Sequence, residues 1–421
     1  MRSLTYGQLI RGNRNFRNLL AGQFISELGN WFNFIAGLGL VRFVSEASPT
    51  AAGIFFVSRL IPFAIVSPFA GTFVDRFSRR KVMIATDLAR VGVALMFLFV
   101  TSAENLWIAY VATALLSVFG AFFDGAKNAA APNLTGKEGL LAGTALLFST
   151  RFLLMAIGSA LGGWAAYRFG YQAAFLINAA SFLASAYTVW LIPEEATRDQ
   201  DTADRMASKA NREPFMTELR EGIRYTLTER FAATILIMNV IWATGGGSIN
   251  IVFERLGGVH FAGLENWNPD AAVGLLWFAA GGGLALGMLI AHRTSIYLDR
   301  RNRNRAFIGW TLIIHGILFS IGGLMPTLWL LAVFVFISRA IVGVEYAVQE
   351  TMFQRSLPDH IRGRISTLDR GAELTVFGIS SFAAGEAMYY ISPQTLTVIS
   401  GVLSALAGVV WFIRQPKELT R

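Results

Sequence analysis

Residues 71–81, GTFVDRFSRRK, form a short loop between two long apolar runs and carry one acid and four basic residues. Residues 299–305, DRRNRNR, repeat the Asp-Arg start and the later basic residues between another pair of apolar runs. A repeated loop between similar hydrophobic segments indicates an internal duplication. Each run is about 20 residues long, the length of a helix that crosses a bilayer. The two loops therefore predict a duplicated polytopic membrane protein.

The composition supports a membrane protein and excludes several other classes. Of the 421 residues, 54% are hydrophobic and only 15% are charged, whereas soluble domains are about 25% charged. Such a chain is neither disordered nor a soluble enzyme with one appended anchor. A porin-type barrel is excluded because its strands alternate over about ten residues. The chain has no cysteine, so it forms no disulfide or thiolate metal site, and we expect no metal and no cofactor.

We predict an all-α integral membrane protein with twelve transmembrane helices in two pseudo-symmetric six-helix bundles. The predicted spans are 18–43, 51–73, 82–102, 106–127, 140–167, 171–192, 231–254, 271–292, 306–325, 327–350, 366–391 and 394–413. The polar start of the chain runs straight into a span too long for the core of a signal peptide, so we expect the first helix to be retained.

A polar segment divides the predicted spans into two sets of six. Residues 1–192 would form the N-terminal bundle, 193–230 a cytoplasmic linker and 231–421 the C-terminal bundle. Within the linker, Phe215 and Ile223 lie at helical spacing with Leu219. This pattern predicts an amphipathic helix on the cytoplasmic face of the membrane.

The net charge of +9 is explained by membrane topology, so we expect no nucleic-acid partner. Placing both termini on one side assigns 28 of the 36 Lys and Arg residues to that side and only Arg42, Arg168 and Arg255 to the other. Loops on the cytoplasmic side of membrane proteins are enriched in Lys and Arg. Both termini are therefore expected to be cytoplasmic.

The loop at 71–81 resembles the loop 2–3 signature of the major facilitator superfamily, and its echo at 299–305 is expected in that family. Residues 354–364, QRSLPDHIRGR, and the segment from Phe122 to Pro132 look like the branch of bacterial macrolide-efflux and siderophore-export permeases. The resemblance covers essentially the whole chain. Ser78 replaces the usual glycine, which we expect to loosen the loop, and Asn30 replaces an acid found in many branch members, which argues against proton coupling there.

This resemblance implies a secondary active transporter that works by alternating access in the bacterial inner membrane. Its expected partners are protons, the lipid bilayer and a bulky amphiphilic substrate of drug or siderophore type, which it would export as a monomer. A lysolipid flippase or an uptake symporter of the same fold is the main alternative, and a passive channel or scramblase is a weaker one. An enzyme is disfavoured, because the four histidines form no zinc-helix pattern and the sequence has no phosphate loop or nucleophile motif.

The charged loops suggest a conformational latch, a charge cluster that holds the helix ends together in one state of the transport cycle. Asp75 would meet a helix N-terminus or an arginine, and Gly71 would allow close helix approach. The predicted latch residues are Gly71, Asp75, Arg76, Arg79, Arg80, Asp87, Arg90, Asp299, Arg300 and Arg303. The alternative is that these charges only set topology.

Charges within the spans are the candidates for coupling, because a charge in the bilayer is costly unless it has a partner or faces water. On the first span, Gln23, Glu27 and Asn30 fall within one polar stripe. Glu27 lies near the midplane and is the first candidate to exchange protons. A permanent structural pair of Glu27 with Arg59 or Arg151 is the alternative.

Other spans contribute further candidates for the substrate cavity. Asp124 is a candidate gate residue, and Arg339 and Glu350 share a stripe from which Glu345 points away. Arg339 could bind an anion or pair with a neighbouring helix. Arg151 and Glu373 occupy equivalent places in the two halves and are a candidate pair between them.

Overall fold

The computed structural model describes residues 4–74, 76–197 and 215–414. Within these ranges the regular secondary structure is helical, without a β-strand. The chain divides into two compact units: Met1–Ala47 with Ser58–Arg212, and Ser48–Val57 with Glu213–Arg421. These are called the first and the second unit below.

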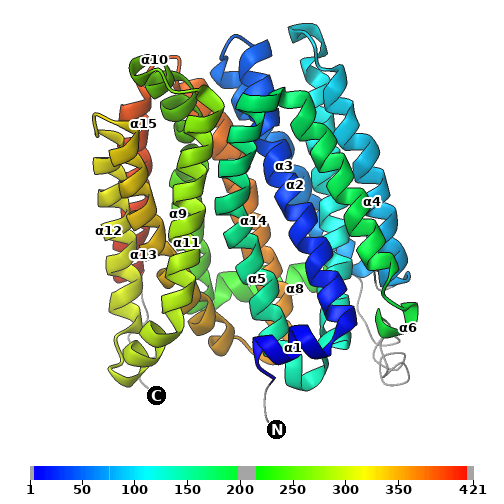
Figure 1. Cartoon of the computed structure of the whole chain (residues 1–421). Helices are drawn as coiled ribbons and strands as arrows, with labels where there is room; N and C mark the ends of the chain where they lie inside the picture. The colour runs from blue at the N-terminus through cyan, green and yellow to red at the C-terminus, as the bar shows by residue number, and fades with distance from the viewer. Residues whose placement is uncertain (1–3, 75, 198–214, 415–421) are drawn as a thin grey trace. The chain divides into compact units, whose positions relative to one another are not determined.

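The first unit is built from long helices joined by short turns (Figure 1). Its helices are α1 (Tyr6–Gly12), α2 (Arg14–Val44), most of α3 (Pro49–Val74), α4 (Arg79–Met96), α5 (Leu106–Trp190) and α6 (Glu194–Thr197), with 3₁₀ turns at Phe97–Phe99 and Ala103–Asn105. Two glycines interrupt α5, Gly136 at φ 64° and Gly170 at φ 80°. Glycine adopts these left-handed conformations without a steric cost, so α5 runs as three helical segments.

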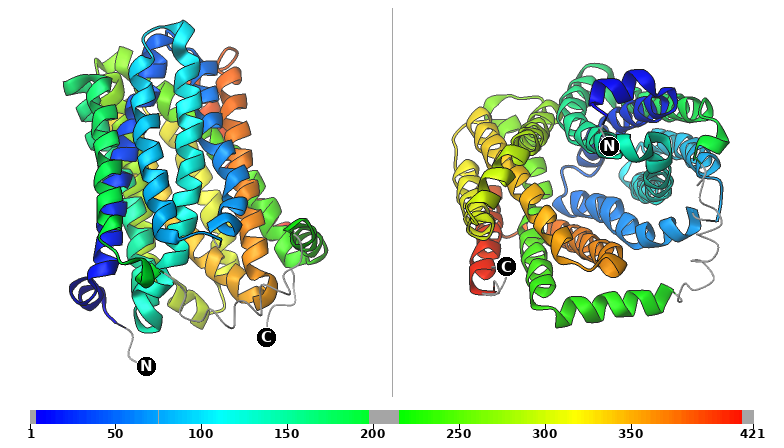
Figure 2. Two further views of the ribbon diagram at one scale, coloured as in Figure 1. Left: turned by 90° about the vertical axis from the view of Figure 1, so that its right-hand side faces the viewer. Right: turned by 90° about the horizontal axis from the view of Figure 1, so that it is seen from below.

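The second unit has the same construction from long helices. Its helices are α8 (Phe215–Thr228), α9 (Arg230–Arg255), α10 (Ala262–Glu265), α11 (Pro269–Arg300), α12 (Asn304–Gly323), α13 (Leu328–Ser356), α14 (Asp359–Ala387) and α15 (Pro393–Arg414), with a π-helical turn at Leu256–Phe261. α8 contacts α9 and α14 and lies across their ends, since Figure 2 shows it side-on where those helices are seen end-on. α8 falls on the amphipathic segment of the predicted linker.

Side chains at the helix starts satisfy the backbone N–H groups that a helix leaves without partners. Asn13 accepts from the backbone of Phe16 at 2.9 Å at the start of α2. Ser78 accepts from the backbone of Lys81 at 3.4 Å at the start of α4. The backbone of Ser78 has φ −66°, which needs no glycine. Ser78 therefore fixes the start of α4, and the loosening expected from the missing glycine is not seen.

Nine helical segments of the described residues are long and apolar enough to cross a membrane. They are Pro49–Gly71, Arg79–Phe99, Ala103–Gly136, Glu138–Trp190, Arg230–Glu265, Pro269–Arg300, Asn304–Gly323, Leu328–Ser356 and Pro393–Arg414. The prediction of an all-α membrane protein is confirmed, whereas twelve spans and two six-helix bundles remain predictions. The predicted spans 140–167 and 171–192 fall in one run around Gly170. The helices α2 and α14 are not among these nine segments, because their polar and charged side chains lower their mean hydropathy.

Small residues bring several helix pairs close together. α11 packs along α13, and a side chain added at Gly343 would lie 3.1 Å from the Cα of Gly287. In the first unit, a side chain at Gly158 of α5 would lie 2.8 Å from the Cβ of Trp31 on α2. Close backbone approach through small residues is how helices associate where lipid provides no hydrophobic drive.

Candidate functional site

The residues of the predicted polar stripe on α2 differ in burial: one packs against a neighbouring helix, and two are partly exposed. Gln23 is 3% exposed, and its Nε2 donates to the main-chain oxygen of Leu147 on α5 at 2.8 Å. Glu27 and Asn30 are half-buried. Gln23 therefore links α2 to α5 through a hydrogen bond. Glu27 and Asn30 remain the candidate cavity residues on this helix.

Glu27 belongs to a charge group with Arg59 on α3 and Arg151 on α5. Arg59 feels the attraction of Glu27 and the repulsion of Arg151. Its guanidinium also lies over the ring of Phe34, 4.4 Å from the centroid. The ring face stabilises a cation at this position. Through Arg59 the structure thus connects the three residues that the sequence offered as alternatives, one acid and two cations.

Asp124 is joined to a cation on its own helix. Lys127 Nζ lies 2.6 Å from Asp124 Oδ1, one turn further along α5, and only 9% of the lysine side chain is exposed. Asp124 also lies within electrostatic range of Arg151 and Arg90. The sequence analysis did not associate Lys127 with Asp124, although its spacing from Asp124 is that of a helical ion pair.

Of the predicted latch residues at the start of the 71–81 loop, the structure describes Gly71 and Arg76. Asp75 lies outside the described residues. Gly71 is exposed, and a side chain built there meets no atom of the structure within 4 Å, so close helix approach at Gly71 was a wrong expectation. Arg76 is exposed as well.

Arg79 and Arg80 bind main-chain carbonyls at the end of the first unit. Arg79 Nη1 donates to the oxygen of Thr197 at 3.1 Å, and Arg80 Nη2 donates to that of Trp190 at 2.6 Å. These oxygens lie at the C-terminal ends of α6 and α5. Helix C-termini leave carbonyls without partners and carry partial negative charge, which cations offset.

Asp87 and Arg90 form a buried pair on α4. The Nη2 of Arg90 donates to Oδ1 of Asp87, and the two side chains are 4% and 0% exposed. The guanidinium also lies over the rings of Phe123 and Phe182 on α5, at 4.5 and 4.4 Å. The Asp87–Arg90 pair therefore packs against α5.

The second loop also contains a charge contact. Asp299 Oδ2 lies 3.3 Å from Arg355 Nη1 on α13, and its Oδ1 accepts from Asn304 Nδ2 at 2.5 Å. Arg300 and Arg303 are exposed. Arg355 was not among the predicted latch residues, because sequence spacing does not show that the end of α13 lies beside the end of α11.

Arg339 is buried in the second unit, 9% exposed, beside the fully buried His315 of α12. Among the described residues its Nε has no hydrogen-bond partner. Arg339 is therefore not held by a carboxylate through this nitrogen. The imidazole is the titratable neighbour that the sequence analysis did not associate with it.

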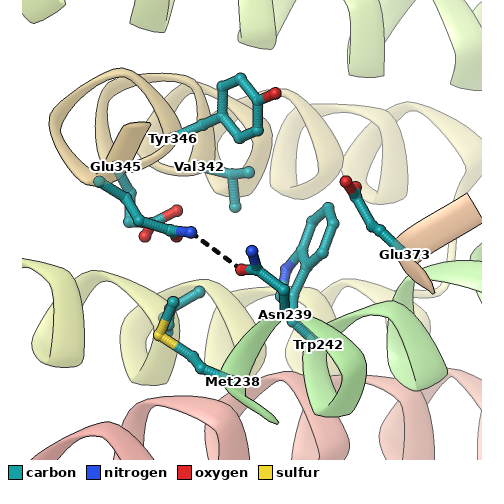
Figure 3. Close-up of a pocket in the computed structure, with 9 residues that line it drawn as sticks. Met238, Asn239, Trp242, Val342, Glu345, Tyr346 and Glu373 are labelled. Atoms are coloured by element: carbon teal, nitrogen blue, oxygen red, sulfur yellow. Dashed lines mark hydrogen bonds between the residues drawn. The ribbon is translucent and has the colours of Figure 1, made fainter. Parts of the chain in front are cut away.

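A small cavity of the second unit brings together residues of four helices (Figure 3). It is lined by Met238, Asn239 and Trp242 of α9, Leu312 of α12, Val342, Glu345, Tyr346 and Gln349 of α13, and Glu373 of α14. Its volume is about 20 Å³. Glu345 was predicted to point away from the stripe of Arg339 and Glu350, and it lines this cavity together with Tyr346 of the same helix.

Amide side chains link the helices around the cavity. Gln349 Nε2 donates to Asn239 Oδ1 at 2.9 Å, and Asn239 Nδ2 donates to Asp369 Oδ2 at 2.9 Å. This amide ladder, Gln349 to Asn239 to Asp369, connects α13, α9 and α14. Asp369 was not a predicted site residue.

The predicted acids of this unit have partners nearby on the chain. Glu373 Oε2 lies 2.7 Å from Arg370 Nη1 on the same helix, and Glu350 Oε1 accepts from Gln354 Nε2 at 2.6 Å. The predicted pairing of Arg151 with Glu373 remains a prediction.

Comparison with known proteins identifies the family of this chain. The family model of the Major Facilitator Superfamily matches residues 19–309. The chain is 24% identical to the MFS-type transporter YfiS of Bacillus subtilis (strain 168), over 96% of this chain and 94% of that protein. It is also 24% identical to macrolide efflux protein A of Streptococcus pyogenes, over 84% of each chain.

The fold is shared with a solved transporter. The nucleoside transporter NupG is 14% identical, with a TM-score of 0.70 over 96% of this chain and all of the NupG chain. The family match covers well over half of the sequence, which confirms the resemblance drawn from the 71–81 loop. The protein is a multi-pass membrane transporter and not an enzyme, and it belongs to the Major Facilitator Superfamily.

Proposed function

We propose that the protein is a secondary active exporter that moves a bulky amphiphilic small molecule outward in exchange for protons. The observation that carries this proposal is the similarity to macrolide efflux protein A over 84% of both chains. A macrolide is a large molecule with both apolar and polar faces. The sequence contains no ATP-binding loop, so uphill transport would draw on an ion gradient.

In this proposal the halves of the duplicated chain alternate in exposing a central site to the two sides of the membrane. The halves are the predicted six-helix bundles of residues 1–192 and 231–421, joined by the linker at 193–230. The transporter would be monomeric in the bacterial inner membrane with both termini in the cytoplasm. The charge asymmetry of the loops supports this orientation.

Coupling is assigned to Glu27 with Arg59 and Arg151. Arg59 interacts with one carboxylate and one further cation, so the group of three carries a net positive charge while Glu27 is ionised. Protonation of Glu27 would remove its attraction for Arg59 and increase the unbalanced charge of the group. A protonation-dependent change in this group would alter the contact of Arg59 on α3 with the aromatic rings of α2, and packed helices respond by switching between arrangements.

The test is transport by purified protein in liposomes. A thermal-shift screen with macrolides, siderophores, lysolipids and sugars first identifies a ligand. We then expect that ligand to move against its gradient only when a proton gradient is imposed, with protons moving in the opposite direction. Substrate and protons moving together would instead support an uptake symporter, and lysolipid movement would support the flippase. Glu104→Gln, in an exposed turn, is the matched control for carboxylate substitutions.

A further inference from the structure

Glu345 is a deeply buried acid that the proposed coupling group does not use. Its residue is 3% exposed, and within the described ranges no hydrogen-bond partner reaches its Oε1. Burying an ionised carboxylate removes its hydration and is costly unless a partner compensates. The neighbouring helix α11 offers no counter-charge, because it has no titratable residue between Asp270 and His292.

The cavity beside Glu345 is large enough for one water molecule. Its volume is about 20 Å³, and a water needs roughly 10–15 Å³ measured in this way. The indole Nε1 of Trp242, which lines the same cavity, is also buried without a partner among the described residues. A water bound here would accept a hydrogen bond from Trp242 and donate one to Glu345. Figure 3 shows Trp242 and Asn239 between Glu345 and Glu373.

The charged and titratable groups on the helices that line the cavity interact with one another. His315 of α12 interacts with Arg339 of α13, and Tyr346 of α13 interacts with Glu350 of the same helix and with Asp369, Arg370 and Glu373 of α14. Arg370 pairs with Glu373, and Asp369 accepts from Asn239 at the end of the amide ladder. α9 contributes methionine, asparagine and tryptophan to the cavity, none of which titrates.

We propose that Glu345 and this cavity form a second proton-binding site, in the second unit and distinct from Glu27. When a proton binds, an O–H bond forms at a carboxylate oxygen of Glu345 as one O–H bond of a hydronium ion breaks, leaving water. Release reverses the step, and no other bond changes. The role of this site in transport rests on the proposed proton coupling, but proton binding at Glu345 does not.

The test is infrared difference spectroscopy of the full-length protein in lipid, without substrate, between two pH values. A protonated carboxyl has a C=O stretching band that is separate from the carboxylate bands and shifts in D₂O. We expect wild type to show this band on acidification and Glu345→Gln to lose one carboxyl equivalent of it. Glu27→Gln is expected to keep the Glu345 component. A Glu345→Gln spectrum identical to that of wild type overturns the proposal.

A second substitution tests the site without removing the acid. Trp242→Phe deletes the N–H group, so we expect the Glu345 band to shift in frequency and keep its area. Trp310→Phe, on an exposed position of α12, is the matched control and should leave the band unchanged. If Glu345→Gln does not fold, an unshifted band in a folded Trp242→Phe protein overturns the proposal. A band that is lost when sodium is added at constant pH shows a metal-cation site and also overturns it.

The same proteins separate this inference from the proposed function. A Glu345 band in a protein whose transport ignores the proton gradient would leave the proton site in place and refute proton-coupled export. Gradient-driven export with no Glu345 band would support proton-coupled export and refute the proton site at Glu345.

Discussion

Arg80 on the first turn of α4 donates through Nη2 to the main-chain oxygen of Trp190, the last residue of α5, at 2.6 Å. The basic residues of the 71–81 loop therefore act on a neighbouring helix end. A guanidinium at a helix C-terminus offsets both the carbonyls without partners and the partial negative charge of the helix. The contact fastens two helices of the first unit where the sequence suggested a latch.

Removing this contact should destabilise the first unit and slow transport. Arg80→Ala is expected to cost about 1–2 kcal/mol, since it deletes a charge-assisted hydrogen bond at a half-buried position. The thermal midpoint in detergent and the initial transport rate should both fall, and ligand affinity should stay the same. Arg76→Ala removes an exposed charge of the same loop and should leave the midpoint unchanged. Equal effects of the two substitutions would show that only the charge of the loop matters.

The cap of α4 gives a second prediction about this loop. Ser78→Ala removes the oxygen that accepts from the backbone of Lys81 and should lower the free energy of unfolding by about 0.5–2 kcal/mol. Ser78→Asp restores an acceptor and should recover most of it. Ser78→Gly, the residue of the family signature, should cost only about a few tenths of a kcal/mol. Thermal midpoints of the three proteins check the order, and a Ser78→Ala protein as stable as wild type would contradict it.

The fold class was predictable because twenty-residue apolar runs and repeated charged loops are local patterns. The number of spans was harder, since a left-handed glycine, Gly170, and not a polar loop separates two segments of α5, and α14 begins with several charges. Twelve spans therefore remain a prediction, with α2 and α14 on the predicted spans 18–43 and 366–391.

The site was predicted only in part, for a related reason. Spacing on one helix placed Glu27 in a polar stripe, but it could not show that Arg59 of a second helix interacts both with Glu27 and with Arg151 of a third. Glu345 was set aside because it points away from the stripe of Arg339 and Glu350, whereas a cavity between four helices reaches it. A lone acid after the apolar run 340–344 was the available signal, because burying a carboxyl is costly.

The predicted topology can be tested directly because the chain has no native cysteine. Single cysteines at Arg76 and Arg301, both exposed, should react with a membrane-impermeant maleimide only after the cells are opened. A cysteine at Glu104, in the exposed turn before α5, should react in intact cells. Labelling of Arg76→Cys or Arg301→Cys from outside would reverse the orientation assigned from the 28 cytoplasmic Lys and Arg residues.

The last prediction separates two roles of Glu27. If its protonation drives exchange, Glu27→Gln mimics the protonated state, and substrate-driven proton movement should vanish. Exchange of substrate across the membrane without an energy source should persist, because it requires only that the loaded carrier reorient. Proton movement, counterflow and the thermal midpoint are to be measured on one preparation, with Glu104→Gln as the control.

If Glu27 is instead a structural partner of Arg59, the same substitution leaves Arg59 near Arg151 without its counter-charge. The stacking of Arg59 on Phe34 would then compensate only in part, and the thermal midpoint should fall together with counterflow. The double substitution Glu27→Gln with Arg59→Gln distinguishes the roles, because it removes the uncompensated cation. Recovery of stability and counterflow without recovery of proton movement supports coupling through Glu27, since the structural defect has then been repaired and only proton exchange is missing. A stable Glu27→Gln protein that still transports uphill with an unchanged pH profile would eliminate Glu27 and move the coupling role to Glu345 in the second unit.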